Sequence, residues 1–167
     1  YKKYGDDTSR FAVLPAYGEA LVASDRADEA IKLLRGQWPQ ALSEAGPYAA
    51  VYVMRPYTAA LLATGKEKEA VSELAGMLTD SPQMLDPSSL STSGGASESI
   101  YTRLVDLLLE QERYDEALSW GKLRFMVCGY DEAAIKGATT MLAKIWTSKT
   151  MTPAPADEFI KAQTSAD

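Results

Sequence analysis

One short phrase occurs three times in this chain, and its repetition constrains the fold more than any other feature of the sequence. The copies are RADEAIKLL (26–34), KEKEAVSEL (66–74) and RYDEALSW (113–120). Each copy has a glutamate, an alanine and then a branched aliphatic residue, and the alanines are Ala30, Ala70 and Ala117. Apolar residues spaced in this way lie on one face of a helix. A small alanine at the centre of that face lets another helix approach closely.

A second helical pattern precedes each copy of the phrase. The segments YGEALVAS (17–24), YTAALLATG (57–65) and LVDLLLEQ (104–111) have apolar residues at i, i+3 and i+4, and a short polar turn joins each to the copy that follows. Gly65, in the second turn, suits the left-handed conformation that ends many helices. A helix, a tight turn and a second helix, repeated three times, predict an all-α chain of stacked helix pairs.

These helix pairs resemble tetratricopeptide (TPR) repeats. The third copy contains RYDEA, which is similar to the opening of the second TPR helix, and the second has Gly65 at its turn and Pro82 after its second helix. The resemblance covers about residues 11–148 and implies a right-handed α-solenoid. The alanines are about 40 and 47 residues apart, however, against about 34 in a TPR unit. The early tryptophan of the first helix is missing in every copy. The longer spacing also suits HEAT or armadillo repeats, but their signatures are absent.

The predicted organisation is a single helical-repeat domain, residues 1–167, of about seven main helices plus a closing helix. We expect repeats at about 11–45, 47–82 and 97–129, a closing helix at about 131–148 and a C-terminal tail at 149–167. The closing helix would cover the apolar face that a terminal repeat leaves exposed. The residues in excess of the TPR length lie between the repeats, in 36–48 and 81–99. Because the chain begins with Tyr1 rather than Met, we expect it to be part of a longer protein.

Three segments of the sequence do not fit a regular repeat. Pro15 and Pro56 fall inside the first helices of the first two repeats, and a proline there predicts either a kink or a helix that begins near the proline. The serine-rich segment 85–97, which contains Gly94 and Gly95, is expected to be a surface loop.

Composition argues against several classes of function. The net charge of −6 disfavours nucleic acid as a partner, and no apolar run approaches the roughly 18 residues of a membrane helix. The chain has no histidine and one cysteine, Cys128, which we expect to be a buried small apolar residue. Histidine is the commonest general base and the commonest transition-metal ligand, and this sequence has none. We expect no metal site, no cofactor, no catalytic residue and no enzymatic activity.

The resemblance to TPR proteins implies a binding surface, because the first helix of each pair lines a concave groove in that family. Carrying that register over selects Glu19, Tyr52, Arg55, Asp106, Glu110, Lys136 and Lys144 as candidate binding residues. The family's best-known groove chemistry clamps a peptide carboxylate with Lys, Arg and Asn. The central Asn positions here are Glu19, Ala59, Asp106 and Thr140, which argues against such a clamp.

The expected function is a non-catalytic scaffold that binds a protein or peptide partner in the groove. One alternative is an accessory or regulatory domain that packs against a neighbouring domain of a larger protein or enzyme. Another is a small-ligand binder or an enzyme that relies on carboxylates. A deep pocket with converging carboxylates would favour the last alternative, whereas a long shallow groove would favour the scaffold.

Overall fold

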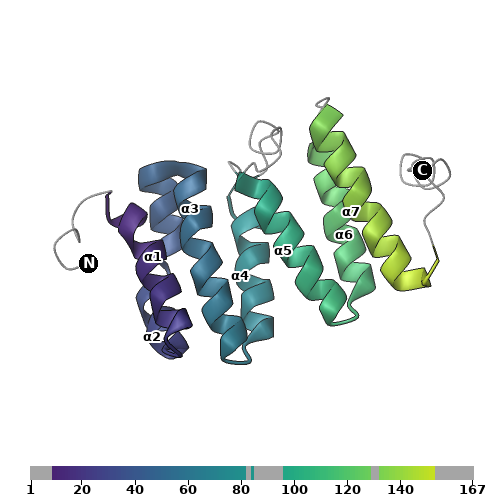
Figure 1. The fold of residues 1–167 in the computed structure, drawn as a ribbon. Coiled ribbons are helices and arrows are strands. Elements are labelled where there is room, and N and C mark those ends of the chain that lie inside the picture. The colour runs from purple at the N-terminus through teal and green to yellow at the C-terminus, as the bar shows by residue number, and fades with distance from the viewer. Residues whose placement is uncertain (1–8, 82–83, 85–95, 129–131, 153–167) are drawn as a thin grey trace. The chain divides into compact units, whose positions relative to one another are not determined.

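The computed structural model describes residues 9–81, 84, 96–128 and 132–152, and these residues form seven α-helices without a β-strand (Figure 1). The expected all-α class is confirmed. The chain divides into two compact units, residues 1–84 and 85–167. Residues 85–95 of the predicted loop and residues 153–167 of the predicted tail lie outside the described residues.

The first unit contains four helices, and the second contains three. The first unit has α1 (Arg10–Ala23), α2 (Ala27–Leu34), α3 (Gln37–Ala63) and α4 (Glu67–Thr79). Within it, α1 packs against both α2 and α3, and α3 also packs against α2 and α4. The second unit has α5 (Ala96–Glu110), α6 (Tyr114–Val127) and α7 (Glu132–Thr150). Here α6 packs against both of its neighbours, and α5 also contacts α7. Among the described helices, none is both long and apolar enough to cross a membrane.

The three turns that join α1 to α2, α3 to α4 and α5 to α6 have the same geometry. Each contains one residue with positive φ: Asp25 (56°), Gly65 (69°) and Glu112 (57°). The next residue donates its N–H to a carbonyl five positions back, at 2.8–2.9 Å: Arg26 to Leu21, Lys66 to Leu61 and Arg113 to Leu108. This is the Schellman motif, which satisfies carbonyls at a helix end. The left-handed conformation expected at Gly65 is confirmed, and it recurs at two positions without glycine.

We expect Asp25→Gly and Glu112→Gly each to raise the free energy of unfolding by about 0.5–1 kcal/mol. A residue with a Cβ is disfavoured in the left-handed region by about 1–2 kcal/mol, and the greater freedom of glycine in the unfolded chain offsets part of that gain. Gly65→Ala is the matched opposite change and should lower stability by about 1 kcal/mol. Urea unfolding of the three variants checks this. A loss of stability in both glycine variants would contradict the assigned turn geometry.

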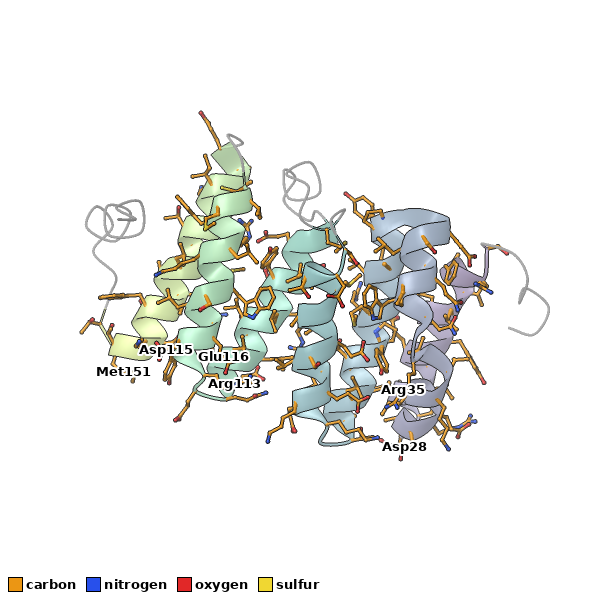
Figure 2. The ribbon with its side chains drawn as sticks, turned by 180° about the vertical axis from the view of Figure 1, so that it is seen from behind. Asp28, Arg35, Arg113, Asp115, Glu116 and Met151 are labelled. Carbon is orange, nitrogen blue, oxygen red and sulfur yellow. The ribbon has the colours of Figure 1, made fainter. Side chains whose placement is uncertain are left out.

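The charged residues of the repeated phrase form ion pairs at the start of the second helix. Arg26 and Arg113 are the N-cap residues of α2 and α6. Each guanidinium donates two hydrogen bonds of 2.6–2.7 Å to the glutamate three residues on, Glu29 or Glu116. Figure 2 labels the second of these pairs, Arg113 and Glu116. These hydrogen bonds lower the pKa of both glutamates. The pairs are solvent-exposed, so they contribute little to stability.

The small residues of the repeats lie at close helix contacts, as the pattern predicts. Ala30, Ala70 and Ala117 are fully buried. A Cβ added at Gly18 of α1 would lie 2.7 Å from Leu34 Cδ1 and 3.2 Å from Pro56 Cβ. The absence of a side chain at Gly18 therefore lets α1, α2 and α3 pack together.

The first inter-repeat segment is helical, and the break in α3 lies at Gly46, directly before Pro47, rather than at Pro56. Residues from Gln37 onward form the first part of α3, although the sequence placed 36–48 between repeats. The non-helical residue inside α3 is Gly46 (φ 86°, ψ −179°), whereas Pro56 lies within the helical part. Likewise α1 begins at Arg10, well before Pro15. Therefore α1 neither begins nor breaks at Pro15, and α3 neither begins nor breaks at Pro56.

A partly buried polar network joins α3 and α4. Glu73 accepts hydrogen bonds from Trp38 Nε1 (3.0 Å) and from the Tyr57 hydroxyl (3.2 Å). Tyr57 is completely buried, and burial together with the Glu73 charge raises its pKa to about 12. The Tyr57 hydroxyl therefore keeps its proton and remains a donor to Glu73.

Candidate functional site

The first candidate site is a groove between α1 and α3, which we call the α1–α3 groove. It has a volume of about 470 Å³, and its floor includes the buried residues Phe11 and Pro15. Three of the predicted binding residues line it: Glu19 from α1, and Tyr52 and Arg55 from α3. Their side chains are exposed, and Arg55 Nη2 lies 4.0 Å from Glu19 Oε1. The groove therefore combines an apolar floor with one loosely paired acid and base.

The spacing of residues along α3 explains why its exposed aromatic side chains gather beside this groove. Tyr48, Tyr52 and Arg55 follow one another at i, i+4 and i+7, so they share one face of the helix. Tyr48 and Tyr52 are 55% and 53% exposed, although large aromatic side chains are usually much more buried. Exposed tyrosines next to an arginine are the residue types found at binding hot spots.

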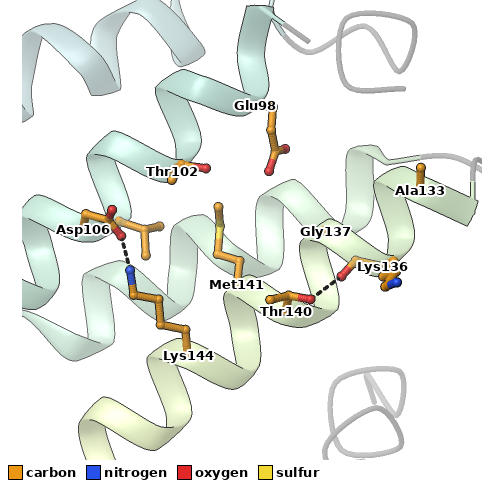
Figure 3. Close-up of a pocket in the computed structure, with 10 residues that line it drawn as sticks. Glu98, Thr102, Asp106, Ala133, Lys136, Gly137, Thr140, Met141 and Lys144 are labelled. Carbon is orange, nitrogen blue, oxygen red and sulfur yellow. Dashed lines mark hydrogen bonds and ion pairs between the residues drawn. The ribbon is translucent and has the colours of Figure 1, made fainter. Parts of the chain in front are cut away.

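The second candidate site is a groove between α5 and α7, which we call the α5–α7 groove (Figure 3). Its volume is about 440 Å³. Each helix contributes a row of three polar residues spaced four apart, which places them on one helix face. The rows are Glu98, Thr102 and Asp106 on α5, and Lys136, Thr140 and Lys144 on α7. Val105, Met141 and Gly137 also line the groove. An acidic row therefore stands opposite a basic row.

Two ion pairs neutralise most of the charge around the α5–α7 groove. At one end, Lys144 Nζ lies 2.6 Å from Asp106 Oδ1 (Figure 3). At the other end, Glu98 pairs with Arg124 of α6 rather than with a residue of α7. Lys136 is exposed and has no ion pair within the described ranges. Lys136 is therefore the lysine of the α5–α7 groove that is not held in an ion pair within the described ranges.

Arg124 is a buried charged residue that the sequence analysis did not identify. Its side chain is 1% exposed, and its Nε donates to Glu98 Oε2 at 2.6 Å while Nη1 donates to the Ala134 carbonyl at 3.0 Å. A Cβ on Gly137 would lie 2.9 Å from Arg124 Nη2, so glycine leaves space for the guanidinium. One side chain of α6 thus joins α5 and α7 beneath the groove.

A signal for this buried arginine was present in the sequence. The core-facing positions of α6 are Ala117, Gly121, Arg124 and Cys128, which follow the i, i+4, i+7 and i+11 spacing. A charged residue in such a row needs a partner in the protein interior. Glu98, on the preceding helix, supplies it.

A buried tyrosine in the second unit keeps its proton near neutral pH. Tyr101 is completely buried, its ring lies edge-on to Trp120 at 6.4 Å, and its hydroxyl has no hydrogen-bond partner in the described structure. Burial raises its pKa to about 12. The hydroxyl therefore stays protonated near neutral pH.

The remaining candidates lie outside the two grooves. Glu110 is exposed at the end of α5 and lines neither groove. Cys128 is 2% exposed, which confirms the expected burial, and its thiol donates to the Phe125 carbonyl at 2.9 Å. In the described part of the chain, no three or more Asp, Glu or Cys side chains gather as metal ligands would.

The α1–α3 groove thus lies between the first helices of two consecutive pairs, and the α5–α7 groove lies between the first helix of the third pair and the last described helix. Each is open to solvent along one side of its unit, and each combines apolar lining with exposed charged side chains.

No protein-family model matches the chain, and comparison with curated proteins and with solved structures likewise found no match.

Proposed function

We propose that the protein is a non-catalytic scaffold that binds a protein or peptide through the α1–α3 groove. The observation that carries this proposal is the exposure of Tyr52 and Arg55 beside an apolar floor. Exposed aromatic and guanidinium groups next to a groove lose solvent when a partner covers them, and such residues dominate the energy of many interfaces.

We also propose that the helix pairs of each unit follow a TPR-like, right-handed solenoid path. Three observations support this. The three turns within pairs share one left-handed geometry, and the first helix of a pair contacts the helix that follows the pair, α1 with α3 and α5 with α7. Ion pairs within the first unit also join residues 34 or 38 positions apart, close to the length of one TPR unit: Arg10 with Glu44, Arg35 with Glu69, and Asp28 with Lys66.

The chemistry of the grooves supports binding rather than catalysis. The α1–α3 groove has one carboxylate, Glu19, which faces the guanidinium of Arg55. The two carboxylates of the α5–α7 groove, Glu98 and Asp106, are each engaged by a basic side chain. A carboxylate oxygen that already accepts a hydrogen bond from a basic side chain is less available to take a proton from a substrate, so these carboxylates are poorly placed as general bases.

We expect the double variant Tyr52→Ala, Arg55→Ala to lose affinity by about 2 kcal/mol or more while keeping its helical circular dichroism. The probe is a set of peptides selected on the wild-type chain from a phage-displayed random dodecapeptide library. Each selected peptide is then synthesised and titrated against the variant by calorimetry.

The matched control for this test is Tyr17→Ala, Arg26→Ala. Tyr17 is 44% exposed on α1, Arg26 is the N-cap of α2, and neither lines the α1–α3 groove. This variant should keep the wild-type affinity. Peptides that bind the Tyr52/Arg55 variant as tightly as the wild type, or a selection that enriches no peptide family, would argue against the proposed scaffold.

A further inference from the structure

We infer that the α5–α7 groove binds an internal peptide segment in which an aliphatic side chain stands next to an acidic one. The aliphatic group would sit on Val105 and Met141, and the acidic group would pair with Lys136. This inference rests on the proposed scaffold function and assigns a partner chemistry to a second groove, in the other unit.

The charge balance of the groove selects an acidic group. Glu98 is engaged by the buried Arg124, and Asp106 by Lys144, so these four charges cancel in pairs. Lys136 stands in the same row as Lys144 (Figure 3) but forms no ion pair among the described residues, although Glu132 lies one helical turn before it on α7. An incoming carboxylate therefore meets an ammonium group that holds no carboxylate in an ion pair, and no net negative charge.

The buried guanidinium determines where that free charge lies. Because Arg124 holds Glu98 from below, at 2.6 Å from Nε, Glu98 does not serve as the partner of Lys136 across the groove. Gly137 makes this possible, since a Cβ there would clash with Arg124 Nη2 at 2.9 Å. Arg124 thus acts as a positioning residue, because it touches no ligand and leaves Lys136 available to one.

The apolar lining and the size of the groove select the rest of the ligand. Val105 and Met141 are 1% and 8% exposed, so together they form a nearly flush apolar floor between the two polar rows. The Thr102 hydroxyl is exposed and makes no hydrogen bond with another described residue, so it can bond to a peptide backbone. A volume of about 440 Å³ fits a few side chains rather than a folded domain.

The test uses the intact chain and the same phage-displayed dodecapeptides, which have no C-terminal carboxylate because the coat protein follows them. Wild-type protein should enrich peptides with an aliphatic–acidic pair. One enriched peptide is then synthesised with acetylated and amidated ends, so that its acidic side chain carries the only carboxylate. Its affinity should fall at least about tenfold when the protein carries Lys136→Glu.

Charge reversal gives a second, positive readout. When Lys replaces the acidic residue of the peptide, the Lys136→Glu protein should bind that peptide better than the wild type does. Lys122→Glu is the matched control, because Lys122 is exposed in the same unit and lines neither groove. That variant should bind the acidic peptide as the wild type does.

The outcomes separate this inference from the scaffold proposal. Selected peptides that respond to Tyr52→Ala, Arg55→Ala but not to Lys136→Glu would overturn the inference and leave the scaffold standing. An equal loss in Lys122→Glu would also overturn it, because the effect would then come from overall charge. Selection of a Lys136-dependent peptide without an aliphatic neighbour would remove the role assigned to Val105 and Met141.

Discussion

Replacing Glu98 by alanine should lower the free energy of unfolding of the second unit by about 3–5 kcal/mol. Arg124 is 1% exposed, and Glu98 is its carboxylate partner in the described structure. Without that carboxylate, a guanidinium would stay buried with only the Ala134 carbonyl beside it. An uncompensated buried charge is among the most destabilising changes that one substitution can make. Hydrogen exchange of the amides of α5, α6 and α7 in the intact chain measures the effect.

Two further variants separate the loss of the pair from the loss of a charge. Glu110→Ala removes an exposed carboxylate from the same helix and should change stability by no more than about 0.5 kcal/mol. The double variant Glu98→Leu, Arg124→Met replaces the pair by apolar groups and should be close to the wild type. If Glu98→Ala were as mild as Glu110→Ala, Arg124 would not depend on Glu98.

In the first unit, Glu73→Leu should lower the free energy of unfolding by about 3 kcal/mol. Its carboxylate accepts hydrogen bonds from both Trp38 and Tyr57, and each orphaned buried donor costs about 1–3 kcal/mol. Glu73→Gln keeps one carbonyl acceptor and should lose only about 1 kcal/mol. Urea unfolding followed by tryptophan fluorescence measures both variants. Equal losses in the two variants would mean that packing, rather than these hydrogen bonds, sets the effect.

The helix pairs were predictable because their determinants are local. Apolar spacing, the buried alanines and the glycine of one turn act within a few residues, and the structure has helices and close contacts at those places. The left-handed conformation of Asp25 and Glu112 was not predicted, because glycine is the residue type that favours positive φ and neither residue is a glycine. The helical start of α3 was not predicted either. Proline and glycine are common in loops, and this segment contains Pro39 and Gly46.

The candidate site was only partly predictable, because charge pairing depends on contacts between helices. The register placed Tyr52 and Arg55 on one face of one helix, and the structure has both in the α1–α3 groove. By contrast, the burial of Arg124 depends on Glu98, 26 residues earlier, and on the empty space at Gly137. Read along its own helix, Arg124 falls in the core-facing row of α6, but that helix does not indicate which carboxylate pairs with it. The pairing of Asp106 with Lys144, and hence the isolation of Lys136, likewise appears only when α5 and α7 face each other.

The short reach of the ion pairs between helices bears on how each unit forms. Within the described ranges, these ion pairs connect residues 26 to 38 positions apart. Closing a chain segment of that length loses little more entropy than closing a much shorter one, because the loss grows only with the logarithm of length. Both units therefore have low contact order, and helical proteins of that kind fold within microseconds to milliseconds. Each new helix can find its partner in the helices made just before it, without waiting for the far end of the chain.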